Sequence, residues 1–116
     1  MGNTTKSIDW NSCLELSNHK PDLAKELLTM FIDDMPNAKN DIEKALHENN
    51  LEMLGNYAHK LHGACCYVGV PKLRAIIREL ENAARQHKKA NCTLLIQKMR
   101  LEMEAVKISA EKKDYL

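Results

Sequence analysis

The strongest constraint on the fold of this chain is a run of apolar residues at alternating spacings of three and four positions. The run consists of Leu51, Leu54, Ala58, Leu61, Cys65 and Val68. Such spacing places every member on one side of an α-helix, so that side must be buried against other elements. Asn50 is a suitable N-cap and Gly69 a suitable terminator, which predicts a helix over residues 51–68.

Other segments carry apolar stripes of the same period, whereas alternation with a period of two is not sustained anywhere. They predict a short helix over residues 9–17, a long one from Pro21 to about 48 and another from Pro71 to about 87. A basic loop over residues 87–90 leads to a last helix capped by Asn91.

Pro36 lies inside the long predicted helix, where it removes one backbone hydrogen bond and crowds the preceding turn. The apolar stripe keeps its phase on both sides of this proline, from Phe31 to Ile42. We therefore expect one long, kinked helix rather than two helices redirected by a turn.

These stripes predict an all-α fold, because four amphipathic helices joined by short loops bury their apolar sides best in an antiparallel four-helix bundle. The short first helix is expected to cover one end of the bundle as a lid. A chain of 116 residues should form a single domain, here residues 1–116. We expect an ordered core over about 8–110, with the terminal segments 1–7 and 111–116 frayed.

Composition excludes several classes of function. The formal net charge is +1, so nucleic acid is not an expected partner. The sequence contains neither a stretch of roughly 20 apolar residues nor the apolar region of a signal peptide, so we expect a cytoplasmic domain without membrane contact. The four cysteines form no Cys-x-x-Cys motif and no close pair with histidine, which favours reduced, buried thiols over a metal site.

Two histidines of the third helix differ in where they face. Advancing about 100° per residue, His59 lies roughly 130° from the centre of the apolar stripe, whereas His62 lies roughly 70° from it. His59 should therefore face water, and His62 should lie at the edge of the core, where a structural hydrogen bond is expected. Gly63 lies nearly opposite the stripe, at a position where glycine costs a helix about 1 kcal/mol relative to alanine.

An imidazole that faces water is a nucleophile near neutral pH, because its reference pKa is about 6.5. Attack on phosphorus requires reach and a nearby cation rather than a deep pocket. The bare backbone at Gly63 leaves His59 sterically open, and Asn56, Lys60 and Tyr67 frame the same side. A solvated surface histidine without a role fits this position equally well.

The segment 58–73 reads Ala-His-Lys-Leu-His-Gly-Ala-Cys-Cys-Tyr-Val-Gly-Val-Pro-Lys-Leu. It resembles the motif of histidine-containing phosphotransfer (HPt) domains, in which His-x-Leu-Lys-Gly is followed by a turn of small residues and a glycine. The resemblance extends over the whole chain and is greatest to the C-terminal HPt domain of hybrid sensor histidine kinases of the BarA/GacS type. His62 departs from the motif, because most of the family has lysine there.

The resemblance implies that His59 is the phosphoacceptor, that Gly63 provides clearance for a partner, and that His62 and Lys60 are auxiliary groups. The partners it implies are receiver domains of a hybrid sensor kinase and of a response regulator, whose aspartates donate and accept the phosphoryl group. The domain itself needs no cofactor, because the magnesium ion belongs to the receiver. Asn56, Cys66 and Tyr67 are then candidates for the docking surface.

Other classes of function fit the sequence less well. A di-iron bundle would need Glu-x-x-His pairs, and the sequence contains none. The dimerisation and phosphoacceptor hairpin of a sensor kinase also carries a reactive histidine, but an acidic residue follows it there, whereas Lys60 follows His59. A monomer distinguishes an HPt domain from that hairpin, and an inert helical adaptor would never be phosphorylated. The absence of a glycine-rich nucleotide-binding loop argues against direct use of ATP.

Overall fold

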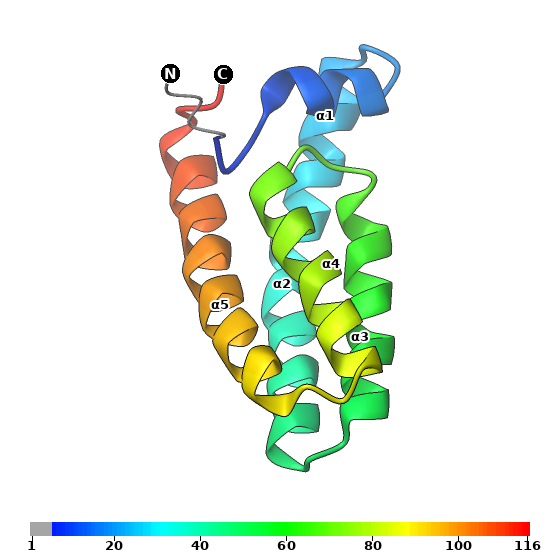
Figure 1. Ribbon diagram of the computed structural model, residues 1–116. Coiled ribbons are helices and arrows are strands. Elements are labelled where there is room, and N and C mark those ends of the chain that lie inside the picture. Colours follow the sequence, from blue (N-terminus) through cyan, green and yellow to red (C-terminus); the bar gives the residue numbers. More distant parts are fainter. Residues whose placement is uncertain (1–5) are drawn as a thin grey trace, which may run out of the picture.

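The computed structural model describes residues 6–116, which form five helices and, within that range, no strand (Figure 1). The helices are α1 (Trp10–Leu16), α2 (Pro21–His47), α3 (Leu51–Cys65), α4 (Pro71–Arg85) and α5 (Lys89–Lys112). Helices α2 to α5 run antiparallel to their neighbours in a bundle, and α1 lies across one end of it (Figure 1). The predicted all-α bundle with an N-terminal lid is confirmed.

Helix α2 continues through Pro36 without a break, as the unbroken phase of its apolar stripe predicted. Phe31 and Met35 before the proline and Ile42 after it are all buried in the same core. The helix begins at Pro21, whose missing N–H would have had no partner in the first turn, with Asp22 beside the positive end of the helix dipole.

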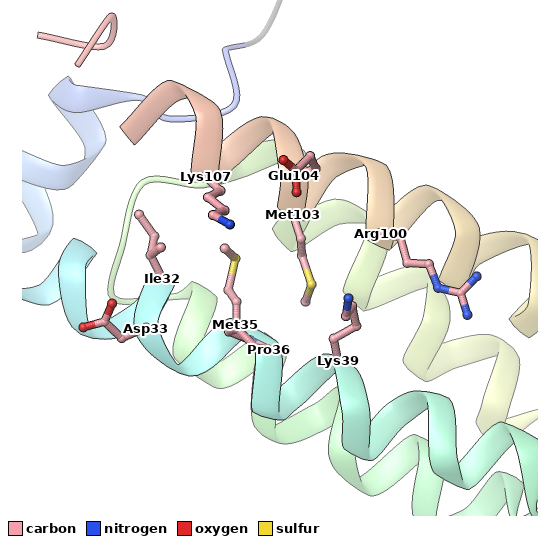
Figure 2. A pocket seen from close by; sticks show the side chains of 9 residues that line it. All are labelled: Ile32, Asp33, Met35, Pro36, Lys39, Arg100, Met103, Glu104 and Lys107. Atoms are coloured by element: carbon pink, nitrogen blue, oxygen red, sulfur yellow. The ribbon is translucent and has the colours of Figure 1, made fainter. Parts of the chain in front are cut away.

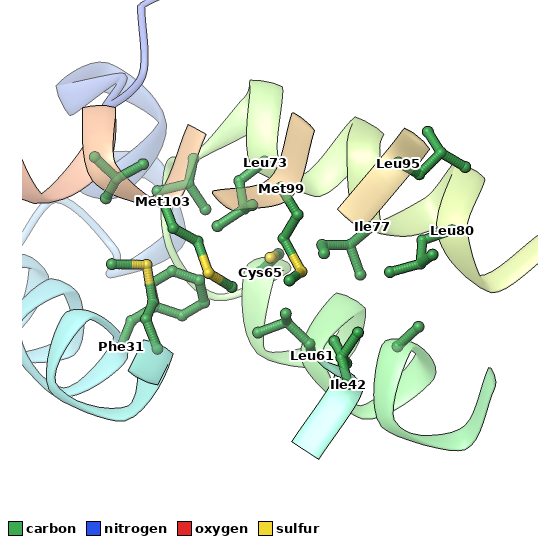
Figure 3. Close-up of a cluster of buried hydrophobic side chains, with 14 of the residues drawn as sticks. Phe31, Ile42, Leu61, Cys65, Leu73, Ile77, Leu80, Leu95, Met99 and Met103 are labelled. Atoms are coloured by element: carbon green, nitrogen blue, oxygen red, sulfur yellow. The ribbon is translucent and has the colours of Figure 1, made fainter. Parts of the chain in front are cut away.

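The core between the four long helices is filled by aliphatic and sulfur-containing side chains (Figure 3). Leu54, Ile77 and Met99 are fully buried there, each from a different helix. Cys13, Cys65 and Cys92 are buried and Cys66 is half-buried, and all four are free thiols. Burial raises the pKa of the Cys65 thiol from 9.0 to about 12, so this group is a neutral part of the core.

The prediction that α3 extends to Val68 is wrong, because the helix ends at Cys65. The Cys66 N–H donates to the carbonyl of Gly63 instead of continuing the α-helical pattern, and a turn carries the chain towards Pro71. Val68 is still buried, so the apolar period persisted past the end of the helix. Asn50 caps the other end as predicted, its Oδ1 accepting from the Met53 N–H at 3.0 Å.

Gly69 fastens this turn to the N-terminal lid through a close backbone approach. The Asp9 N–H donates to the Gly69 carbonyl at 2.8 Å, and the Gly69 N–H donates to Cys13 Sγ at 3.3 Å. A Cβ atom at position 69 would lie 2.3 Å from the Asp9 carbonyl oxygen. Only glycine therefore fits between α1 and the α3–α4 turn.

The expected loop over 87–90 and the expected cap at Asn91 are also wrong. Helix α4 ends at Arg85, and α5 begins at Lys89 with Lys88 as an N-cap that makes no side-chain hydrogen bond. His87 adopts a left-handed φ of 56°, which lets the Lys88 N–H donate to the Ala83 carbonyl and reverses the chain within a few residues. The reversal is complete before Asn91, so α5 starts early.

The two ends of the described chain pack together at the lid. Helix α5 runs to Lys112, past the expected end of the ordered core near 110, and the Tyr115 ring packs against Trp10 with centroids 5.6 Å apart. This aromatic pair attaches the segment after α5 to α1, and the fraying of 111–116 stays a prediction. At the other end Ile8 is fully buried, while the expected fraying of 1–5 lies outside the described residues.

Candidate phosphoacceptor site

His59 projects from α3 into water, as its angular position predicted. Its side chain is 71% exposed, although it stands on a helix that is otherwise packed between α2 and α4. The ring Nδ1 lies 2.9 Å from Oε2 of Glu81 on α4, whose side chain is 20% exposed. One ring nitrogen therefore faces a carboxylate, while the side chain as a whole remains open to a partner.

Glu81 belongs to a small polar network that joins α3 to α4. Arg85 lies one turn further along α4, with Nη2 3.7 Å from Glu81 Oε2, and its Nη1 donates to Oδ1 of Asn56 at 3.0 Å. Gly55 makes room for this guanidinium, because a Cβ atom there would lie 2.9 Å from Arg85 Nη1. Asn56, predicted to frame the site, is thus connected to His59 through two residues of α4.

Sequence reasoning missed both Glu81 and Arg85. A signal was available, since the two residues are four positions apart on a helix whose buried members include Ile77 and Ala84. That spacing places both on one edge of α4, but it does not tell which helix the edge faces. Their contacts with His59 and Asn56 depend on the register between α3 and α4, which the sequence does not give.

Gly63 leaves the helix surface bare one turn beyond His59, as predicted. Within residues 6–116, nothing lies within 4 Å of the position that a Cβ atom would occupy there. The glycine is not needed for the backbone conformation, because its φ is not positive. Its missing side chain therefore matters only to something that approaches from outside.

His62 lies at the edge of the core as predicted, but the expected structural hydrogen bond is missing at one ring nitrogen. Its Nε2 is buried and has no hydrogen-bond partner in the described part of the chain.

Lys60 lies on the opposite flank of α3 from the Glu81 contact. It lines a hollow of about 170 Å³ between α2 and α3, together with Asp34, Asp41 and Tyr57. Tyr67, in the turn after α3, is 68% exposed, whereas Cys66 is half-buried. The predicted site residues therefore lie on both flanks of α3 and in the turn after it, and the structure does not gather them into one pocket.

A larger hollow of about 330 Å³ lies between α2 and α5, away from these residues (Figure 2). Met35 and Met103 lie within it, and Lys39, Arg100 and Lys107 surround them. Arg100 pairs with Glu43 across the two helices. None of the residues predicted for the site lines this hollow, so it does not bear on the chemistry of His59.

Among residues 6–116 no three histidine, cysteine or acidic side chains are grouped so that they could hold a metal ion. In the same range no helix is both long enough and apolar enough to cross a bilayer.

Residues 26–108 match the Hpt domain family. The chain belongs to this family. The predicted helical fold and the predicted function, histidine phosphotransfer in a two-component phosphorelay, are thereby confirmed. Hpt domains interact with receiver domains and response regulators in such relays, so the class of partner expected from the sequence is confirmed as well.

Curated relatives of this Hpt domain are much longer proteins. It is 36% identical over 83 residues to the signal transduction histidine-protein kinase BarA of Escherichia coli and 33% identical over 86 residues to the sensor histidine kinase GacS of Pseudomonas protegens. The matches cover 72% and 74% of this chain but only 9% of each relative. The similarity therefore concerns one domain of each kinase.

Solved structures agree with the fold. A crystal structure of the Hpt domain from a Shewanella hybrid histidine kinase has a TM-score of 0.81 at 32% identity, covering 91% of this chain and 92% of that one. Histidine-containing phosphotransfer protein B of Pseudomonas aeruginosa has a TM-score of 0.84 at 24% identity, covering 95% of this chain and 96% of that one, which supports the fold alone.

Proposed function

We propose that His59 is the phosphoacceptor of this Hpt domain. In this proposal its Nε2 takes a phosphoryl group from the aspartyl phosphate of one receiver domain and later yields it to the aspartate of another. The observation that carries the proposal is the combination of an exposed imidazole with an open helix surface at Gly63. A partner can therefore bring its acidic pocket over the ring without meeting a side chain.

The receiver supplies most of the transition-state stabilisation in this scheme. Phosphoryl transfer depends mainly on positioning and on charge stabilisation, and the carboxylate of an aspartyl phosphate is a good leaving group. Magnesium and a lysine of the receiver would neutralise the phosphoryl oxygens. The Hpt domain contributes the nucleophile and a surface to dock on, and it needs neither ATP nor a cofactor of its own.

Two auxiliary groups are part of the proposal. Lys60 adds positive charge beside the acceptor from the α2 side of α3, where its neighbours Asp34 and Asp41 partly offset that charge. His62 replaces the lysine found in most of the family, and its buried Nε2 would reach a phosphoryl group only if the ring turned outward. We therefore assign His62 a smaller contribution than a lysine would make.

The docking surface in this proposal comprises the exposed side of α3 together with the turn that follows it. Asn56 lies at its lower end, Gly63 in the middle, and Cys66 and Tyr67 at its upper end. Exposed Tyr67 offers an apolar ring with a polar tip, which is typical of protein interfaces. The acidic wall of the hollow between α2 and α3 would favour a basic element on the receiver.

We further propose that the domain is a cytoplasmic monomer, either free or as the C-terminal domain of an inner-membrane sensor kinase. The four helices of one chain already bury their apolar sides against one another, so no second copy is needed to complete the bundle. Light scattering at increasing concentration tests this directly. A concentration-dependent dimer would instead favour the hairpin of a sensor kinase.

Transfer of labelled phosphate in two steps tests the function. A receiver labelled on its aspartate is mixed with the wild-type domain, His59→Gln or His62→Gln, and the labelled domain is then offered to a second receiver. We expect label on the wild type and on His62→Gln, onward transfer from both, and none on His59→Gln. Label on His59→Gln at the wild-type level would refute the assignment.

A further inference from the structure

We infer that the hollow between α2 and α5 binds a small amphiphilic carboxylate, a molecule with one carboxylate group on a short apolar body. The hollow measures about 330 Å³, which is at the lower end of the range of pockets that hold small ligands. None of the residues proposed for phosphotransfer lines it. The inference therefore goes beyond the proposed function and does not rest on it.

The floor of the hollow is apolar and adaptable. Met35 on α2 and Met103 on α5 extend into the space between the two helices (Figure 2). Both side chains are buried, so they form a floor rather than a solvated surface. Methionine side chains are unbranched and polarisable, and they fit apolar groups of different shapes. A short alkyl chain would therefore find apolar contacts on both helices.

Pro36 explains why no side chain of α2 fills this space. Its short ring lines the hollow, and its nitrogen has no hydrogen to donate to the carbonyl of Ile32, which also lines the hollow. A longer side chain at this position could reach across towards α5. The open space is therefore a property of the backbone and sequence of α2.

The rim of the hollow carries positive charge that the fold does not use. Figure 2 shows the ammonium groups of Lys39 and Lys107 pointing into the space between the helices. In the part of the chain that the structure describes, neither nitrogen lies within 4.0 Å of a carboxylate oxygen. Arg100, by contrast, already pairs with Glu43. Lys39 and Lys107 are thus available to a ligand, one from each helix.

The charges around the hollow favour a ligand with a single negative charge. Asp33 and Glu104 also line the rim, as exposed side chains that pair with neither lysine. They would repel a phosphate dianion more strongly than a carboxylate. Lys39 is half-buried, so a carboxylate would meet its ammonium group where water screens the attraction less than at the open surface.

Methyl spectra of methionine-labelled protein, titrated with hexanoate, test the inference without relying on activity. We expect the methyl signals of Met35 and Met103 to shift in a saturable way, with a Kd in roughly the millimolar range because the ligand is small. The signals of Met30 and Met53 should stay in place, since these exposed methionines do not line the hollow. Acetate, which lacks the apolar body, should produce no saturable shift.

A double variant tests the role of the two lysines. We expect Lys39→Gln combined with Lys107→Gln to weaken binding of hexanoate by about fivefold or more, and to leave the weaker binding of uncharged 1-hexanol unchanged. Lys98→Gln combined with Lys112→Gln is the matched control, because it removes the same charge from exposed lysines of α5 outside the hollow. This control should bind hexanoate like the wild type, and circular dichroism verifies that both variants remain folded.

Three results would overturn the inference: no shift at Met35 and Met103, an equal shift at all the methionines followed, or equal affinity of the wild type and of the Lys39 and Lys107 double variant for hexanoate. The second result would indicate unspecific binding, and the third an apolar hollow without a preference for anions. No step of the titration involves His59 or a receiver. Failure of the proposed function would therefore leave this inference untouched.

Discussion

Two glycines of α3 show how the same residue can serve opposite purposes. Gly55 and Gly63 both stand inside the helix, where glycine is unfavourable relative to alanine. The space above Gly55 is filled by the guanidinium of Arg85, whereas the space above Gly63 is open among the described residues. At the scale of single residues, one glycine therefore admits a neighbour from the same chain, and the other leaves room for a partner.

Replacing Gly63 with glutamine should separate folding from function. Glutamine is a better helix former, so the free energy of unfolding should rise by about 0.5 kcal/mol. The long side chain would stand where a receiver must approach, and phosphotransfer should fall by more than about tenfold. Chemical denaturation and the labelled-receiver assay measure the two effects.

Gly63→Ala is the matched control for this substitution. It raises helix propensity at the same position but adds only a methyl group to the open surface, so transfer should fall far less than in Gly63→Gln. Transfer that survives in Gly63→Gln at the wild-type rate would show that the bare surface has no role in docking.

At the scale of elements, the α3–α4 turn and the lid depend on each other. Gly69→Ala should lower the free energy of unfolding by about 2 kcal/mol or more, because its Cβ cannot share space with the Asp9 carbonyl and one of the two must move. Trp10, the only tryptophan, lies in α1 and reports the lid by its fluorescence. An unfolding midpoint equal to that of the wild type would contradict the packing described for this turn.

The helices themselves could be predicted from apolar periodicity, but several of their ends could not. The apolar period of α3 continues from Cys65 to Val68, although Val68 lies in the turn after the helix. Buried residues of a turn are apolar for the same reason as those of a helix, so the period does not mark where the helix ends. The end of α4 depends on His87 adopting a left-handed conformation. Glycine is the usual sequence signal for that conformation, and this position has none. The side of α3 that carries His59 could be predicted from angular position. The contact with Glu81 could not, because it depends on how α4 packs beside α3.

At the scale of the whole molecule, the buried thiols make stability depend on alkaline pH. Desolvation raises the pKa of Cys65 to about 12, so the folded state keeps its proton between pH 9.0 and about 12 while the unfolded chain loses it. The unfolded state then binds fewer protons, and stability falls as pH rises, by up to about 1.4 kcal/mol per pH unit for this thiol.

Cys65→Ala tests that dependence. The substitution removes one titrating group from the core, so unfolding free energies measured between pH 8 and pH 11 should decline less steeply than in the wild type. Burial also raises the pKa values of Cys13 and Cys92, so part of the decline should remain. Parallel pH profiles for the two proteins would mean that Cys65 is ionised in the folded state or exposed to solvent.

The phosphoryl group should be carried by a single imidazole, that of His59. Locating this group on the chain tests the assignment most directly. Trypsin cleaves after Lys60, which separates His59 in residues 45–60 from His62 in residues 61–72. Digestion at alkaline pH, which preserves phosphohistidine, followed by mass spectrometry with fragmentation should locate the modification on His59. A phosphoryl group found on residues 61–72 or on His47 would contradict the account.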